Sequence, residues 1–146
     1  NLVITRTFSK IYGLAGLRIG YAMASAEVAD LMNRVRQPFN CNNLAIAAAA
    51  AALGDEEFVA RSYALNRAGM EQIVAGLKRL GYAHIPSSGN FLAFKAGDAA
   101  ALNQKLLKQG VIVRPVAGYG MPEWLRVTIG SENENARFLE ALELAQ

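Results

Sequence analysis

The sequence predicts an α/β fold that ends in a small α+β domain, and three observations lead to this prediction. From residue 55 onward, apolar spacing, caps and glycines indicate the order helix, strand, strand, helix, strand, strand, helix. This order is typical of helices packed on a small sheet. Hydrophobic residues make up 53% of the 146 residues and charged residues 18%, which excludes a disordered chain. The single cysteine excludes an internal disulfide framework and indicates a reducing compartment.

Local signals indicate where each element begins and ends. Ser25, Asp55 and Asp98 stand where a helix N-cap is expected, and Ser131 and Glu134 have the spacing of a capping box. β-branched and aromatic residues favour strands between these helices. The predicted strands are residues 2–7, 18–24, 82–85, 91–95, 111–114 and 124–129, and the predicted helices are 26–37, 44–53, 56–80, 99–109 and 132–145.

Charge and hydropathy narrow the classes of partner. Fifteen Lys and Arg against twelve Asp and Glu leave a net charge of +3, which is too small and too dispersed to predict nucleic-acid binding. The longest apolar run, residues 44–53, is too short to span a bilayer, so no membrane partner is expected. The chain opens directly in a predicted strand, which needs partner strands. We therefore expect these residues to be part of a longer protein.

One polar segment carries candidate chemistry. Thr7, Ser9 and Arg18 offer two hydroxyls and a planar guanidinium, which together suit a phosphate dianion. Lys10 lies between them and could act as a nucleophile, provided that burial or a cationic neighbour favours its neutral form. Three glycines in residues 13–20 allow tight turns and a close approach to a ligand. The spacing is not that of a nucleotide P-loop, and a surface turn with an exposed lysine and a salt-bridged arginine remains the alternative.

Residues 7–20 closely resemble the lysine region of the fold-type I pyridoxal-phosphate-dependent aminotransferases, and most of all the histidinol-phosphate aminotransferase branch. The pattern S-K-x-x-G-L-A-G-L-R-x-G is matched at each of its defined positions. The resemblance continues in order along the chain and corresponds to the C-terminal part of that family. Further matching segments are residues 40–43, 88–91, 113–115 and 125–130.

The resemblance implies roles for four residues of the first segment. Lys10 would bind pyridoxal phosphate covalently, and would then move the proton between the substrate Cα and C4′ of the cofactor as general base and acid. Ser9 and Arg18 would hold the phosphate of the cofactor, with Thr7 as a weaker candidate for the same site. No metal site is predicted.

Three further residues are expected on the substrate side. The resemblance implies that Arg126 pairs with the substrate α-carboxylate or its equivalent polar end. Arg114 would bind the distal group of the substrate, and Asn90 would line the same side. The alternatives are that both arginines are solvated charges at strand ends, and that Asn90 only bonds local backbone.

The implied function is amino-group transfer with pyridoxal phosphate, most closely that of the histidinol-phosphate branch in histidine biosynthesis. Two alternatives belong to the same class of enzyme: an aromatic amino-acid aminotransferase and a threonine-phosphate decarboxylase. A third alternative, from a different class, is a non-catalytic isolated C-terminal domain. A small amino donor, a 2-oxoglutarate-type acceptor, a homodimer and a cytoplasmic location are also implied.

The resemblance divides the chain into three parts. Residues 1–24 would be two strands of the large cofactor domain, residues 25–54 connecting helices, and residues 55–146 the small C-terminal domain. In this family the aspartate that pairs with the pyridinium nitrogen lies before the lysine segment, so we expect residues 1–146 alone to be inactive. The first two strands should have exposed edges, and should be disordered, re-paired or buried in an oligomer contact.

Overall fold

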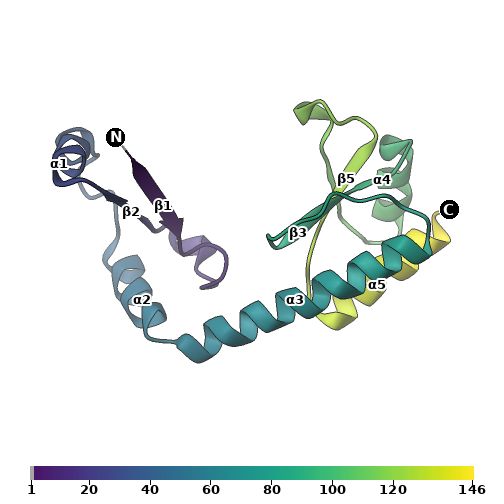
Figure 1. Ribbon diagram of the computed structural model, residues 1–146, viewed down its shortest axis with the longest axis horizontal. Helices are drawn as coiled ribbons and strands as arrows, with labels where there is room; N and C mark the ends of the chain where they lie inside the picture. The colour runs from purple at the N-terminus through teal and green to yellow at the C-terminus, as the bar shows by residue number, and fades with distance from the viewer. Residues whose placement is uncertain (1) are drawn as a thin grey trace. The chain divides into compact units, whose positions relative to one another are not determined.

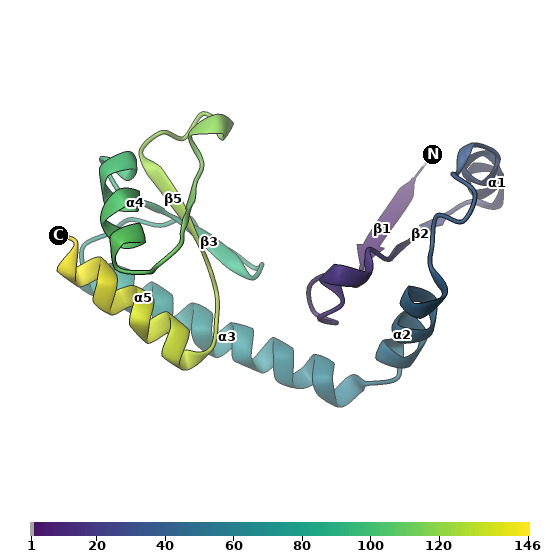
Figure 2. The same ribbon diagram turned by 180° about the vertical axis from the view of Figure 1, so that it is seen from behind.

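The computed structural model describes residues 2–146 and divides into two compact units, the first ending at Tyr63 and the second spanning Ala64–Gln146. Figures 1 and 2 show the elements from opposite sides. The mixture of helices with two small sheets confirms the α/β class. The elements in order are β1 (Val3–Thr7), η1 (Ala15–Leu17), β2 (Gly20–Ala24), α1 (Ala26–Val35), α2 (Asn43–Leu53), α3 (Glu56–Arg79), β3 (Phe91–Lys95), α4 (Ala99–Lys108), β4 (Arg114–Pro115), η2 (Ala117–Tyr119), β5 (Trp124–Thr128) and α5 (Glu132–Leu144).

The first unit is built on a two-stranded antiparallel sheet. β1 and β2 pair along their full length, from Val3 opposite Ala24 to Thr7 opposite Gly20. Three outcomes were predicted for these strands: disorder, re-pairing, or burial in an oligomer contact. Both strands are ordered, so the first of these is not found. Each keeps its outer edge free of strand partners in the described part of the chain.

Side-chain caps begin the helices of the first unit. The Ser25 hydroxyl accepts a hydrogen bond from the Val28 N–H at 3.4 Å and starts α1, as predicted. α1 ends at Val35, two residues earlier than expected, because Arg36 already has an extended backbone and Pro38 disfavours the helical conformation of Gln37. α3 begins after Asp55, whose carboxylate accepts from the Phe58 N–H at 3.0 Å.

The second unit contains a three-stranded antiparallel sheet in the order β3-β5-β4. Alternate residues of β3 and β5 are buried, which gives the sheet one core face and one outer face. Leu92 and Phe94 lie on the core face and are almost fully buried. The core is completed by α4, α5 and the part of α3 in this unit, with α5 running alongside α3 (Figure 1).

Two predicted strands are reduced to a single bridge or two residues, and the strand predicted over 18–24 begins only at Gly20, because Arg18 ends the short helix η1. Residues 82–85 lie beside β3 but form only one bridge, between His84 and Phe94. Residues 111–114 contribute only Arg114 to β4, because the Val111 N–H bonds the Leu106 carbonyl at the end of α4 instead of joining the sheet. Pro115, which has no N–H, then limits the strand to two residues. None of the helices described in residues 2–146 has both the length and the apolar composition of a membrane crossing.

Candidate active site

The predicted lysine segment forms a closed loop between β1 and β2. Backbone hydrogen bonds run from the Phe8 N–H to the Ile19 carbonyl at 3.2 Å and from the Leu14 N–H to the Phe8 carbonyl at 2.9 Å. Phe8 is only 4% exposed, and its ring contacts the ring of Tyr12 at a centroid distance of 4.9 Å. The loop therefore has a definite shape, although its sheet has only two strands.

A glycine makes the turn that follows the lysine. The Gly13 N–H donates to the Lys10 carbonyl at 2.9 Å, and Gly13 has a φ of 70°. This left-handed conformation is strained for residues that carry a Cβ. The turn therefore accounts for one of the motif glycines.

Polar side chains converge on one side of this loop. The Arg18 guanidinium lies 3.4 Å from the Ser9 hydroxyl oxygen and donates to the Ala15 carbonyl at 2.9 Å. The Thr7 hydroxyl accepts a hydrogen bond from the Ser9 N–H at 3.0 Å. Hydroxyl and guanidinium donors that converge in this way can bind a phosphate group. The structure thus brings together the three residues that were predicted to hold a phosphate.

Arg18 itself has an unusual backbone conformation. It ends the short helix η1 with a φ of 54°, in the left-handed region. For a residue with a Cβ this conformation costs about 1–2 kcal/mol. Strained backbone of this kind clusters at functional sites, although exposed Phe39 has the same φ. Here the conformation directs the guanidinium of Arg18 back over the loop toward Ser9.

Lys10 is exposed and lies directly after Ser9. Within residues 2–146 its amine takes part in no ion pair and no side-chain hydrogen bond. The alternative from the sequence was a surface turn in which Arg18 forms a salt bridge. No carboxylate of the described chain pairs with Arg18, so this salt bridge is not found. The loop therefore presents an unengaged amine on the residue that follows Ser9.

In the second unit, Arg114 and Arg126 lie directly opposite each other on β4 and β5. Opposed residues of neighbouring strands project from the same face of a sheet, and like charges in that position repel. An anion bound between the two guanidinium groups would remove this repulsion. The pairing therefore favours an anion site on the outer face of the sheet.

Arg126 is held in place by an aromatic ring. Its guanidinium carbon lies 4.4 Å from the centroid of the Phe91 ring, a cation–π contact. Its Nε is buried and has no hydrogen-bond partner in the described residues. A buried donor without a partner is costly.

A pocket of about 340 Å³ lies beside this arginine. The Tyr119 hydroxyl lies 3.5 Å from a guanidinium nitrogen of Arg114, on the same side. Asn90 is half-buried, and its carbonyl accepts from the Ile129 N–H at 2.8 Å. Lining residues include Ser87, Phe91, Val116, Tyr119, Met121 and Arg126.

The predicted residues thus form two sets, one within each unit. The first holds Thr7, Ser9, Lys10 and Arg18, and the second holds the two arginines with Asn90 near the end of their sheet. Phe91 and Tyr119 were given no role from the sequence. Alternation along residues 91–95 could have put Phe91 on the same sheet face as Arg126, but only the strand register makes them neighbours.

Three comparisons place this chain among known proteins. The model of the family "Aminotransferase class I and II" matches residues 1–142. A histidinol-phosphate aminotransferase of Dechloromonas aromatica is 79% identical over 145 residues, which cover 99% of this chain and 40% of that protein. The chain therefore spans about two fifths of the length of this relative.

Solved structures agree with this match. The histidinol-phosphate aminotransferase of Sinorhizobium meliloti in complex with pyridoxal-5'-phosphate is 30% identical with a TM-score of 0.90, over 99% of this chain and 41% of that one. The L-threonine-O-3-phosphate decarboxylase of Porphyromonas gingivalis is 29% identical with a TM-score of 0.83, over 99% of this chain and 46% of that one. With the family model matched along nearly its whole length, the chain belongs to the class I and II aminotransferases.

Proposed function

We propose that the protein transfers an amino group with pyridoxal phosphate as cofactor, and that its amino donor is histidinol phosphate. The relative from Dechloromonas aromatica carries that name at 79% identity, and the similar structure from Sinorhizobium meliloti contains the cofactor. The observation that carries the proposal is the loop of the first unit, where the Ser9 hydroxyl and the Arg18 guanidinium approach to 3.4 Å beside Lys10.

The donor set of this loop fits the cofactor. A phosphate dianion needs charged and neutral donors that converge, and Arg18 and Ser9 supply one of each, with Thr7 beside them. Lys10 follows Ser9 in the chain and its amine is exposed, and in this assignment the amine would react with the carbonyl group of the cofactor. When bound, the cofactor supplies an electron sink for the bonds at the substrate Cα. Lys10 would attach to it and would then carry the proton at Cα.

The arginines of the second unit would bind the anionic ends of the substrates. Arg126, which rests on the Phe91 ring, would pair with a carboxylate. Arg114, opposite it on β4, would bind the distal phosphate of the donor. Asn90 would line the same side. We further propose a 2-oxoglutarate-type acceptor, a homodimer and a cytoplasmic location for the enzyme.

The test uses the intact protein with added pyridoxal phosphate, and follows glutamate formation from histidinol phosphate and 2-oxoglutarate. We expect the variant Lys10→Ala to lose the cofactor absorbance band that is sensitive to reduction, and to lose roughly 10²–10⁴-fold in kcat. Lys78→Ala is the matched control, since this exposed lysine belongs to the part of α3 in the second unit. Full activity of Lys10→Ala would overturn the proposal.

A second candidate is decarboxylation of O-phosphothreonine, because a decarboxylase of that substrate is also a close structural neighbour. Both candidates require pyridoxal phosphate and an arginine-bound phosphate, so the first unit does not separate them. Release of carbon dioxide from O-phosphothreonine, with no glutamate formed from histidinol phosphate, would favour the decarboxylase.

A further inference from the structure

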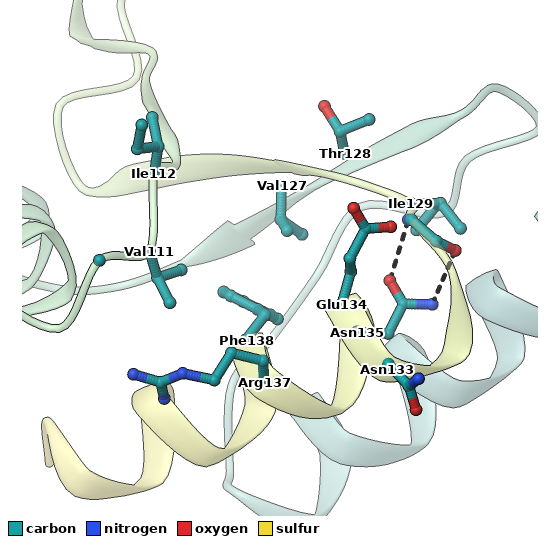
Figure 3. A pocket seen from close by; sticks show the side chains of 12 residues that line it. Val111, Ile112, Val127, Thr128, Ile129, Asn133, Glu134, Asn135, Arg137 and Phe138 are labelled. Carbon is teal, nitrogen blue, oxygen red and sulfur yellow. Dashed lines mark hydrogen bonds between the residues drawn. The ribbon is translucent and has the colours of Figure 1, made fainter.

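A buried asparagine on α5 secures the backbone where β5 ends. Asn135 is 2% exposed and is the one buried polar side chain within residues 2–146. Its carboxamide accepts from the Gly130 N–H at 2.9 Å and donates to the Gly130 carbonyl at 3.2 Å. Figure 3 shows both bonds at the side of an open pocket of about 680 Å³. One side chain thus satisfies both backbone groups of a single residue.

The two hydrogen bonds between Asn135 and Gly130, here called the clamp, are closely surrounded by other residues. A Cβ at Gly69 of α3 would lie 2.7 Å from the Asn135 amide nitrogen and 2.6 Å from Cγ2 of Ile129, so α3 packs directly against the clamp. On the other side, the Glu134 carboxylate accepts from the Ser131 N–H at 2.8 Å. Neighbouring side chains of α5 therefore hold both Gly130 and Ser131.

The clamp is connected to the candidate substrate side. Ile129, next to Gly130, donates its N–H to the Asn90 carbonyl at 2.8 Å, and Thr128 is paired with Phe91. Phe91 carries the ring on which the Arg126 guanidinium rests. Asn135 therefore holds the end of β5 that bonds the backbone of Asn90. The same end is paired with Phe91, the residue under Arg126.

We propose that Asn135 is a positioning residue for the carboxylate-binding arginine, Arg126. It would act by fixing Gly130, and through Ile129 the start of β3, so that the Phe91 ring stays beneath the guanidinium. This inference rests on the proposed function only in the assignment of Arg126 to a substrate carboxylate. The carboxamide is suited to the task because it both donates and accepts, whereas a carboxylate only accepts and an alkyl group does neither.

The test measures KM for 2-oxoglutarate and kcat in the intact enzyme. We expect Asn135→Ala to raise this KM roughly tenfold, with a smaller change in kcat, because a loosened arginine binds its carboxylate in a less favourable geometry. Asn135→Asp keeps the acceptor for the Gly130 N–H and should give a smaller increase, and it also serves if the alanine variant does not fold. Gln109→Ala is the control. It removes a different carboxamide hydrogen bond to α5, the one that Gln109 donates to the Ala141 carbonyl.

A double-mutant cycle separates positioning from a merely structural role. If Asn135 acts through Arg126, adding Asn135→Ala to Arg126→Lys should raise KM no further than Arg126→Lys alone. The inference would be overturned if the two substitutions raised KM by independent factors that multiply in the double variant. It would also be overturned if KM were unchanged in both Asn135 variants. If Arg126→Lys itself left KM unchanged, the assignment of Arg126 in the proposed function would fail instead.

Discussion

The two units of the molecule differ most in how much apolar surface they bury. Among residues 2–146, the first unit has three buried apolar side chains and the second has seventeen. The first unit also carries fifteen of the twenty-two exposed large hydrophobic side chains. Its loop is shaped by local hydrogen bonds, and a lone two-stranded sheet is only marginally stable in water. Lys10, the proposed cofactor lysine, therefore lies on the weakly packed unit, and the two arginines lie on the well-packed one.

The largest effect should come from the core of the second unit. Phe94 is fully buried and contacts the rings of Tyr82 and Phe138. We expect Phe94→Ala to lower the free energy of unfolding by about 3–5 kcal/mol. Phe39→Ala in the first unit, where the ring is 98% exposed, should change it by less than about 0.5 kcal/mol. Urea denaturation followed by far-ultraviolet circular dichroism measures both, since both units contain helices, and similar losses would contradict the contrast between the units.

A smaller effect is expected where α3 packs on the clamp. A methyl group at Gly69 would meet Ile129 and Asn135 within 2.7 Å, and these atoms belong to a closely packed region. Overpacking costs about 1–3 kcal/mol, and the better helix propensity of alanine offsets up to about 1 kcal/mol. Thermal unfolding of Gly69→Ala should therefore show a net loss.

Gly16→Ala in the first unit is the matched control for this substitution. Nothing lies within 4 Å of a Cβ at Gly16. Its melting temperature should stay within a degree or two of the unaltered protein, or rise slightly, because alanine restricts the unfolded chain. A loss as large as that of Gly69→Ala would show that close packing is not what distinguishes the units.

The smallest effect concerns pH and the start of α5. Hydrogen bonds from the Ser131 N–H and then from the Ser131 hydroxyl lower the pKa of Glu134 below its ordinary value. Because the folded-state pKa is the lower one, this contribution to stability is present above the ordinary pKa. It is lost as pH falls through the lowered value.

The variant Glu134→Gln isolates this contribution. Its melting temperature should fall less steeply than that of the unaltered protein as pH is lowered through the acidic range in which Glu134 titrates. The difference should be slight, because the carboxylate lies at the surface. Identical slopes would mean that the capping box contributes no acid sensitivity.

The helix starts could be predicted from the sequence because each depends on residues three apart. Ser25, Asp55 and Asp98 all accept from the N–H three residues later, and Ser131 and Glu134 form the predicted capping box. The strands at residues 82–85 and 111–114 were overestimated. Their apolar residues fit a strand, but hydrogen bonds to the ends of α3 and α4 compete for the same backbone.

The site residues divide along a similar line. The spacing of Ser9, Lys10 and Arg18 is a feature of the chain itself, and a short loop can only hold them near one another. The stacking of Arg126 on Phe91 joins residues 35 positions apart and needs the pairing of β3 with β5. No local signal specifies which residue of one strand lies opposite which residue of another.

The sequence by itself determined the class of fold, the helix caps and the residues of the lysine loop, because these depend on neighbours within a few positions. Only the tertiary structure decided that Arg114 lies opposite Arg126, that the Arg126 Nε is left without a partner, and that Asn135 is buried against Gly130. These features depend on strand register and on packing between α3, α5 and the sheet. Both are set by burial of the whole core and not by any single segment.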